Sequence, residues 1–151
     1  MIAEEPGAFL PKDRWAMYWY YPVLAGVVTG DAARARLAAG YRRFVLHGLG
    51  VRCVADKDWV TAAETAECAL AHLVAGEVGT AALLLEWTRH LRHDDGSYFT
   101  GMVHPQRHHF PAGERSTYSA AAVTLGALAL TAEGPVVPTM LEAAWQRRPA
   151  G

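Results

Sequence analysis

The feature that most constrains the fold of this chain is a unit of sequence that occurs three times. Each unit has an apolar helical stretch, a break at an acidic residue that usually follows glycine, and a more amphipathic helix. The apolar stretches run over residues 14–31, 60–77 and 116–133, with offsets of about 46 and 56 residues. Such a period is typical of stacked helical hairpins. The alternative is a chance similarity among alanine-rich helices.

The hydrophobic periodicity predicts an all-α fold, an α/α-toroid-type repeat of about three helical hairpins that amounts to half of an α/α barrel. We expect helices that start near Asp13, Asp31, Asp58 or Thr61, Gly79, Glu114 and Pro138. The first has almost no polar face, which predicts burial on all sides, a kink at Pro22 and an end at Gly30. Residues 97–113 predict a long irregular loop with room for one short strand.

The length of 151 residues predicts a single domain over residues 13–147, with an N-terminal extension (1–12) and a short tail (148–151). The formal charge of −1 gives no basic field for nucleic acid. The longest apolar run, between Trp15 and Thr29, contains Pro22 and is too short for an integral membrane segment. Cys53 and Cys68 fit no zinc or redox spacing, and we expect reduced thiols and a cytoplasmic protein.

Several motifs are similar to those of known helical repeat proteins. Residues 91–98, with the sequence LRHDDGSY, resemble the DGSW or DGGF turn of squalene-cyclase and prenyltransferase repeats, and RSTYSAAA at 115–122 is similar to the helix that follows it. WYYPVL at 19–24, GLGVRCV at 48–54 and WVTAAET at 59–65 look like actinobacterial proteins labelled prenyltransferase or squalene-cyclase-like. The resemblance implies membership of the terpenoid cyclase and protein prenyltransferase α/α-toroid superfamily.

The catalytic motifs of that superfamily are incomplete in this chain. A DxDD acid would protonate an alkene, but the nearest match is Asp56-Lys57-Asp58-Trp59. The Asp and Cys ligands of zinc prenyltransferases are missing, and Tyr118 stands where a histidine ligand would be expected. Gly48-Leu49-Gly50 lacks the Lys and Ser/Thr of a phosphate loop. We therefore predict no cofactor and no metal.

Four carboxylates are the candidate catalytic residues. Glu64 and Glu67 stand three residues apart and share a face of the predicted helix, as a general acid or substrate-binding pair would. They could hold a cation, sugar hydroxyls or a shared proton, and the alternative is a solvated helix edge. Asp56 and Asp58 are the other two candidates.

Aromatic residues at corresponding positions of the repeats predict a substrate-binding wall. Such a wall can stabilise carbocations by cation–π attraction or stack against sugar rings, and its alternative is ordinary packing between helices. For an anionic head group, Arg115 and Arg52 are the best placed cations. The proposed substrate-binding residues are Trp15, Tyr18, Trp19, Tyr21, Trp59, Arg115 and Tyr118.

His104, His108 and His109 follow Asp94 and Asp95 closely, but their spacing matches no metal-ligand pattern. Two functions remain open. The first is a prenyltransferase-like or terpene-cyclase-like protein that binds an isoprenoid or a saccharide in an aromatic-lined cavity. The second is a non-catalytic, truncated scaffold, whose open arc of helices associates with itself or with a partner chain. In either case we expect a homo-oligomer or a partner.

Overall fold

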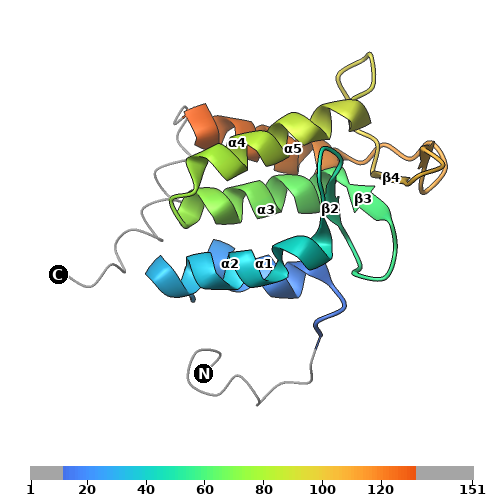
Figure 1. The fold of residues 1–151 in the computed structure, drawn as a ribbon. Helices are drawn as coiled ribbons and strands as arrows, with labels where there is room; N and C mark the ends of the chain where they lie inside the picture. Colours follow the sequence, from blue (N-terminus) through green and yellow to red (C-terminus); the bar gives the residue numbers. More distant parts are fainter. Residues whose placement is uncertain (1–11, 132–151) are drawn as a thin grey trace.

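The computed structural model describes residues 12–131, and the predicted helix over 138–147 lies outside them. Five α-helices and one small antiparallel sheet make up this part of the chain (Figure 1). The helices are α1 (Ala16–Leu24), α2 (Gly30–Phe44), α3 (Ala62–Val74), α4 (Val78–Trp87) and α5 (Thr117–Thr131), and a 3₁₀ turn, η1 (Thr88–Leu91), extends α4. The strands are β1 (Val45–Leu46), β2 (Gly50–Arg52), β3 (Trp59–Thr61), β4 (Gly101–Val103) and β5 (His108–His109).

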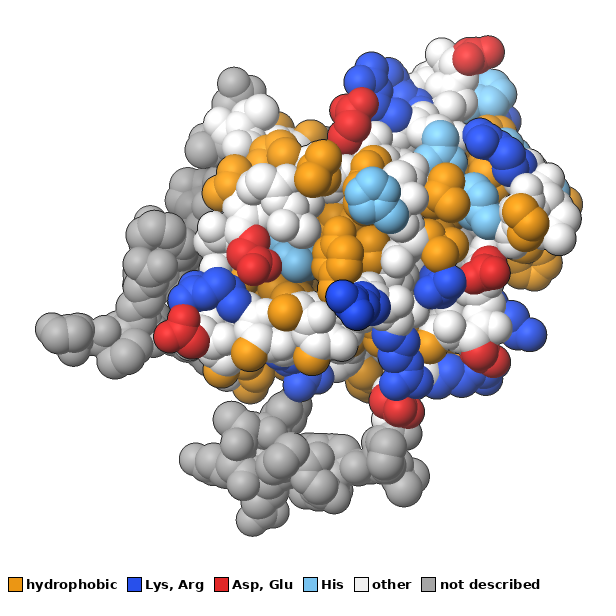
Figure 2. Space-filling model, viewed as in Figure 1, with side chains coloured by type: hydrophobic (Ala, Val, Ile, Leu, Met, Phe, Trp, Pro, Cys, Tyr) orange, Lys and Arg blue, Asp and Glu red, His pale blue; other side chains and the backbone are white. Residues whose placement is uncertain are grey.

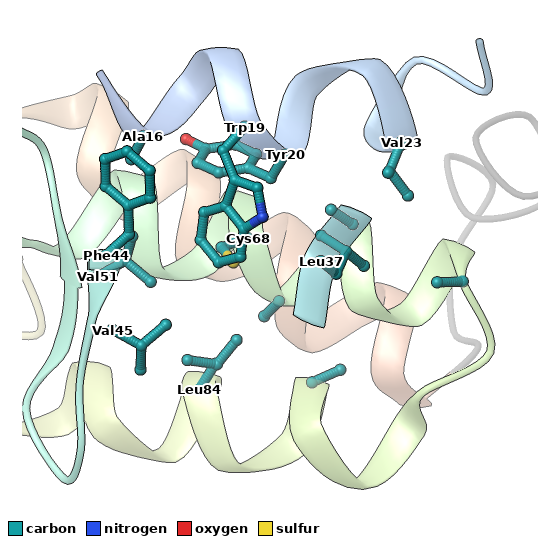
Figure 3. Close-up of a cluster of buried hydrophobic side chains, with 14 of the residues drawn as sticks. Ala16, Trp19, Tyr20, Val23, Leu37, Phe44, Val45, Val51, Cys68 and Leu84 are labelled. Atoms are coloured by element: carbon teal, nitrogen blue, oxygen red, sulfur yellow. The ribbon is translucent and has the colours of Figure 1, made fainter. Parts of the chain in front are cut away.

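The central element is α3, which packs against α1, α4 and α5, while α2 packs on α1 (Figure 1). Small residues allow this, because most of α3 is alanine or a residue of similar size and nine of its thirteen residues are buried. A large part of the core fills the space between α1, α2, α3 and α4 (Figure 3). Within it the indole of Trp19 stacks on Phe44 at a centroid distance of 5.4 Å.

The prediction of an all-α fold is wrong, and with it the prediction of a half α/α barrel, because the segments between helices pair into a sheet. Its strands follow the order β1-β2-β3-β4-β5, and every neighbouring pair is antiparallel. Each strand has two or three residues, too few for an alternation of polar and apolar residues to be seen in the sequence. The predicted loop over 97–113 contains two of these strands.

The sheet is fastened to the start of α3 by one threonine. The hydroxyl of Thr65 donates to the carbonyl oxygen of Thr61 at 2.6 Å and accepts from the backbone N–H of Val51 at 2.9 Å. Gly50 leaves room for it, since a Cβ there would lie 2.6 Å from the Thr65 Oγ1 atom. Strand β2 and helix α3 are therefore held in one fixed relation.

The first helix differs from its prediction in two ways. It ends at Leu24 rather than at Gly30, because Gly26 adopts a left-handed conformation with φ 67° and its N–H bonds to the Val23 carbonyl. It is also not buried on all sides, since Tyr18 is 42 % exposed and Tyr21 37 %. None of the helices within residues 12–131 is long and apolar enough to cross a membrane.

Candidate functional site

The carboxylate of Glu67 on α3 is surrounded by the hydroxyl groups of three tyrosines. Tyr20 and Tyr21 of α1 donate to its Oε2 atom at 2.8 Å and 3.1 Å, and Tyr118 of α5 donates to Oε1. The cluster thus joins three helices that are far apart in the sequence. A carboxylate offers about four lone-pair positions, so three donors leave about one acceptor position open.

The three tyrosines approach Glu67 from different depths. Tyr20 is fully buried and points into the core, as Figure 3 shows, whereas Tyr21 is 37 % exposed and Tyr118 58 % exposed. Adjacent residues of a helix point about 100° apart, which lets Tyr20 support Glu67 from the protein interior while Tyr21 reaches it from the surface. Glu67 itself is half-buried, and the two exposed tyrosines place one side of the cluster at the protein surface.

Burial and the Glu67 charge together keep these tyrosines protonated. Burial is the largest cause that raises the pKa of Tyr20 and of Tyr118, and the nearby carboxylate raises both further. The pKa of Tyr21 is raised for the same reasons. All three phenols are therefore hydrogen-bond donors at neutral pH.

Glu64 lies on the same face of α3, but its contacts are those of a helix cap. Its backbone N–H donates to the Thr61 Oγ1 atom at 3.3 Å, and its carboxylate accepts from the Thr61 hydroxyl. The Thr61 hydroxyl is thus the N-cap of α3, and the Glu64 carboxylate accepts from that hydroxyl. Glu64 also contributes, after burial, to a pKa of about 12 for the thiol of Cys53, which is therefore neutral.

Asp56 and Asp58, the other two predicted carboxylates, lie in exposed ion pairs. Asp56 accepts from Arg14 at 2.9 Å, and this hydrogen bond lowers the pKa of the carboxyl group. Asp58 accepts from Arg52 at 2.7 Å. The structure thus brings together Glu64 and Glu67 only, and we keep Glu67 as the proposed centre of the site.

The predicted aromatic residues are divided between the core and the surface. Trp19 is 7 % exposed, and its indole N–H donates to the Arg36 carbonyl oxygen at 2.9 Å, so it is a core residue. Trp15 and Tyr18 are exposed, with Arg14 against the first and Lys12 bonded to the second. Only Tyr21 and Tyr118 of the predicted set touch Glu67.

Two further predicted residues lie near the sheet. The indole N–H of Trp59 donates to the Phe110 carbonyl oxygen at 3.0 Å, and the two rings meet edge to face. Arg115 donates to the Asp95 carboxylate at 2.6 Å, just before α5 begins. Neither contacts Glu67.

Sequence reasoning missed two residues, Tyr20 and Phe110. Tyr20 has the spacing of an ordinary core residue, and the only signal for its role is the adjacent pair Tyr20-Tyr21, in which one ring is buried and the next is not. Phe110 lies in the predicted irregular loop, where no periodicity separates an exposed ring from a buried one. Both required the tertiary structure.

Several histidine side chains lie at the end of the molecule that carries the sheet, and others lie apart from them (Figure 2). The rings of His90 and His104 meet edge to face at 5.9 Å, and His109 stacks on Phe99 at 3.6 Å. Within residues 12–131, no group of three or more His, Cys, Asp or Glu side chains is arranged to hold a metal ion. His108 is exposed at the edge strand β5.

Comparison with known proteins changes the interpretation of the sequence. No protein-family model matches the chain. Over 134 residues it is 48 % identical to the MMP endo-(1,4)-3-O-methyl-alpha-D-mannosidase of Mycolicibacterium hassiacum. The match covers 89 % of this chain and 37 % of that enzyme, so the chain spans little more than a third of its relative's length.

This similarity corrects the predicted kinship with terpenoid cyclases and prenyltransferases. The relative is a mannosidase, and the sheet is a second argument against the α/α-toroid assignment. The matching motifs are short helix and turn signals that do not depend on one chemistry, which is why they suggested the wrong family. The relative is a glycosidase, which gives no support to an isoprenoid ligand or to a scaffold function. Self-association stays a prediction.

Proposed function

We propose that this chain contributes the saccharide-binding site of an endo-acting α-mannosidase, with Glu67 at its centre. The observation that carries the proposal is the half-buried Glu67 carboxylate, which three tyrosine hydroxyls hold at an open surface. The mannosidase relative supplies the substrate class, an α-(1,4)-linked mannoside that carries 3-O-methyl groups.

The chemistry of the cluster suits a saccharide. Most glycoside hydrolases use carboxylates to bind and activate the groups around the scissile bond. The one acceptor position left open on Glu67 can receive an O–H group, either from a sugar or from a water molecule. Because Tyr20 and Tyr21 both donate to Oε2, this position belongs to Oε1, which receives only Tyr118 among the described residues.

The roles of the two glutamates differ in this proposal. Glu67 binds the substrate and is the candidate catalytic carboxylate, while Glu64 holds the start of α3 through Thr61. Tyr21 and Tyr118 offer apolar ring surface beside a polar hydroxyl, a combination that fits a sugar with a methyl ether.

The test is a binding titration of the full chain with α-(1,4)-linked 3-O-methylmannose oligosaccharides, followed by calorimetry. Glu67→Gln keeps the side-chain shape and removes the charge, and we expect it to weaken binding at least about tenfold, which corresponds to one charge-assisted hydrogen bond. Glu86→Gln is the matched control, because Glu86 is exposed on α4 and pairs with Arg89. Equal affinity of the Glu67 variant and the unaltered chain would overturn the proposal.

A further inference from the structure

The face of the sheet next to the Glu67 site carries an aromatic pair. Trp59 and Thr61 are two residues apart in β3, so their side chains point to the same face. Gly101 pairs with Thr61 in the neighbouring strand, and a Cβ at Gly101 would lie 2.5 Å from the Trp59 Nε1 atom and 3.0 Å from the Thr61 Cγ2 atom. The indole ring therefore lies across β4, in space that a glycine leaves free.

Phe110 completes the pair and is fixed at both of its backbone groups. Its N–H donates to the Gly101 carbonyl oxygen at 3.0 Å, and its carbonyl oxygen accepts from the Trp59 indole at 3.0 Å. The two rings meet edge to face, with a centroid distance of 5.6 Å and an angle of 88°. Yet the Phe110 side chain is 49 % exposed, so a large apolar ring is presented to solvent by a well-fixed backbone.

The aromatic pair is linked to the Glu67 site through β3 and the start of α3. Thr61 shares its sheet face with Trp59 and contacts Glu64, and Glu67 follows one turn later on the same face of α3. Two residues of strand and six of helix separate Trp59 from Glu67, so their Cα atoms lie at most about 16 Å apart, the value for a strand and a helix in one line. A short run of linked sugars can bridge a gap within that limit.

We propose that Trp59 and Phe110 form a second saccharide-binding site, which stacks against another sugar ring of the glycan that Glu67 binds. This inference rests on the proposed function. An endo-acting enzyme cleaves inside a chain and must hold sugars on both sides of the reacting unit. The exposed aromatic ring provides the apolar surface for the C–H face of a sugar, and its fixed backbone lowers the entropy cost of binding.

The experiment compares short and long α-(1,4)-linked 3-O-methylmannose oligosaccharides with the chain and with Phe110→Ala. We expect the variant to lose roughly fivefold to tenfold in affinity for long oligosaccharides, the worth of one stacked ring, and to bind short ones unchanged. Phe110→Tyr should restore the long-chain affinity, since it keeps the ring. Leu83→Ala is the control, because Leu83 is another exposed apolar residue and lies on α4.

The outcomes separate the two proposals. If the chain binds oligosaccharides and Glu67→Gln weakens them, but Phe110→Ala has the same effect on short and long ligands or none on either, the second site is refuted and the first stands. If the unaltered chain binds no mannoside of any length, both proposals are refuted. Circular dichroism of each variant establishes that it is folded.

Discussion

Replacing Tyr20 by phenylalanine tests whether the buried tyrosine holds Glu67. The substitution removes one oxygen atom and leaves the ring in the core, where it meets Trp19 and Tyr21 edge to face. What is lost is a hydrogen bond of 2.8 Å to a carboxylate, and such bonds contribute about 1.5–3 kcal/mol. Since Glu67 is half-buried and keeps two other donors, we expect the lower end of this range. The free energy of unfolding should fall by about 1.5 kcal/mol, which lowers Tm by roughly 4 °C.

Urea unfolding followed by tryptophan fluorescence measures this loss. Tyr41→Phe is the matched control, because Tyr41 is half-buried against His72 and its hydroxyl has no hydrogen bond to any residue within 12–131. The Tyr41→Phe substitution should lower the free energy of unfolding by less than about 0.5 kcal/mol. A double-mutant cycle with Glu67→Gln should give a coupling free energy of at least about 1 kcal/mol. A coupling near zero would refute the reasoning, whatever the stability of the single variants.

Two further predictions concern stability. Gly101→Ala should lower the free energy of unfolding by about 1–3 kcal/mol through overpacking, since its Cβ would lie 2.5 Å from both the Trp59 indole and the Val60 carbonyl oxygen. Gly79→Ala in α4 meets nothing within 4 Å and should raise the free energy of unfolding by up to about 1 kcal/mol. Equal urea midpoints for the two variants would contradict this. The second concerns pH. Burial lowers the pKa of His72 below its ordinary 6.5, despite its contact with Glu77. As the pH drops, His72 therefore takes up a proton in the unfolded chain before it does so in the folded one, and the free energy of unfolding falls through about pH 6.5. His72→Gln should flatten that part of the pH profile, and an unchanged slope would count against it.

The helices could be predicted from the sequence because each extends over nine or more residues, long enough for a helical pattern to be seen. The alanines of α3 favour a helix and Gly76 favours its end, and the tertiary contacts of this helix agree with both local signals. The sheet could not be predicted, since β1 and β5 have two residues each and owe their existence to neighbours elsewhere in the chain. Val45 and Leu46, for example, read as the end of a helix until β2 is available to pair with them.

The candidate site was predicted in part, for a similar reason. The spacing of Glu64 and Glu67 is a helix property and correctly predicts a shared face. Thr61, three residues before Glu64, is also a local signal of a helix start, but nothing local tells that Glu67 receives three hydroxyls. Trp19 and Tyr20 are neighbours with the same apolar character, yet only the packing of α1 on α3 decides that Tyr20 reaches Glu67. The aromatic residues of the sequence therefore predicted too large a binding surface, since Trp19 is a core residue, and they did not reveal that Tyr20 holds Glu67.

The hydroxyl of Thr65 has a consequence for the position of the whole site. It bonds both to the Thr61 carbonyl, where α3 starts, and to the backbone of β2, so any tilt of the sheet turns the first turns of α3 with it. Glu64 and Glu67 belong to those turns of α3, whereas Trp59 belongs to strand β3 of the sheet. The thirteen residues of the five-stranded sheet therefore fix the distance between the two glutamates and the Trp59 ring.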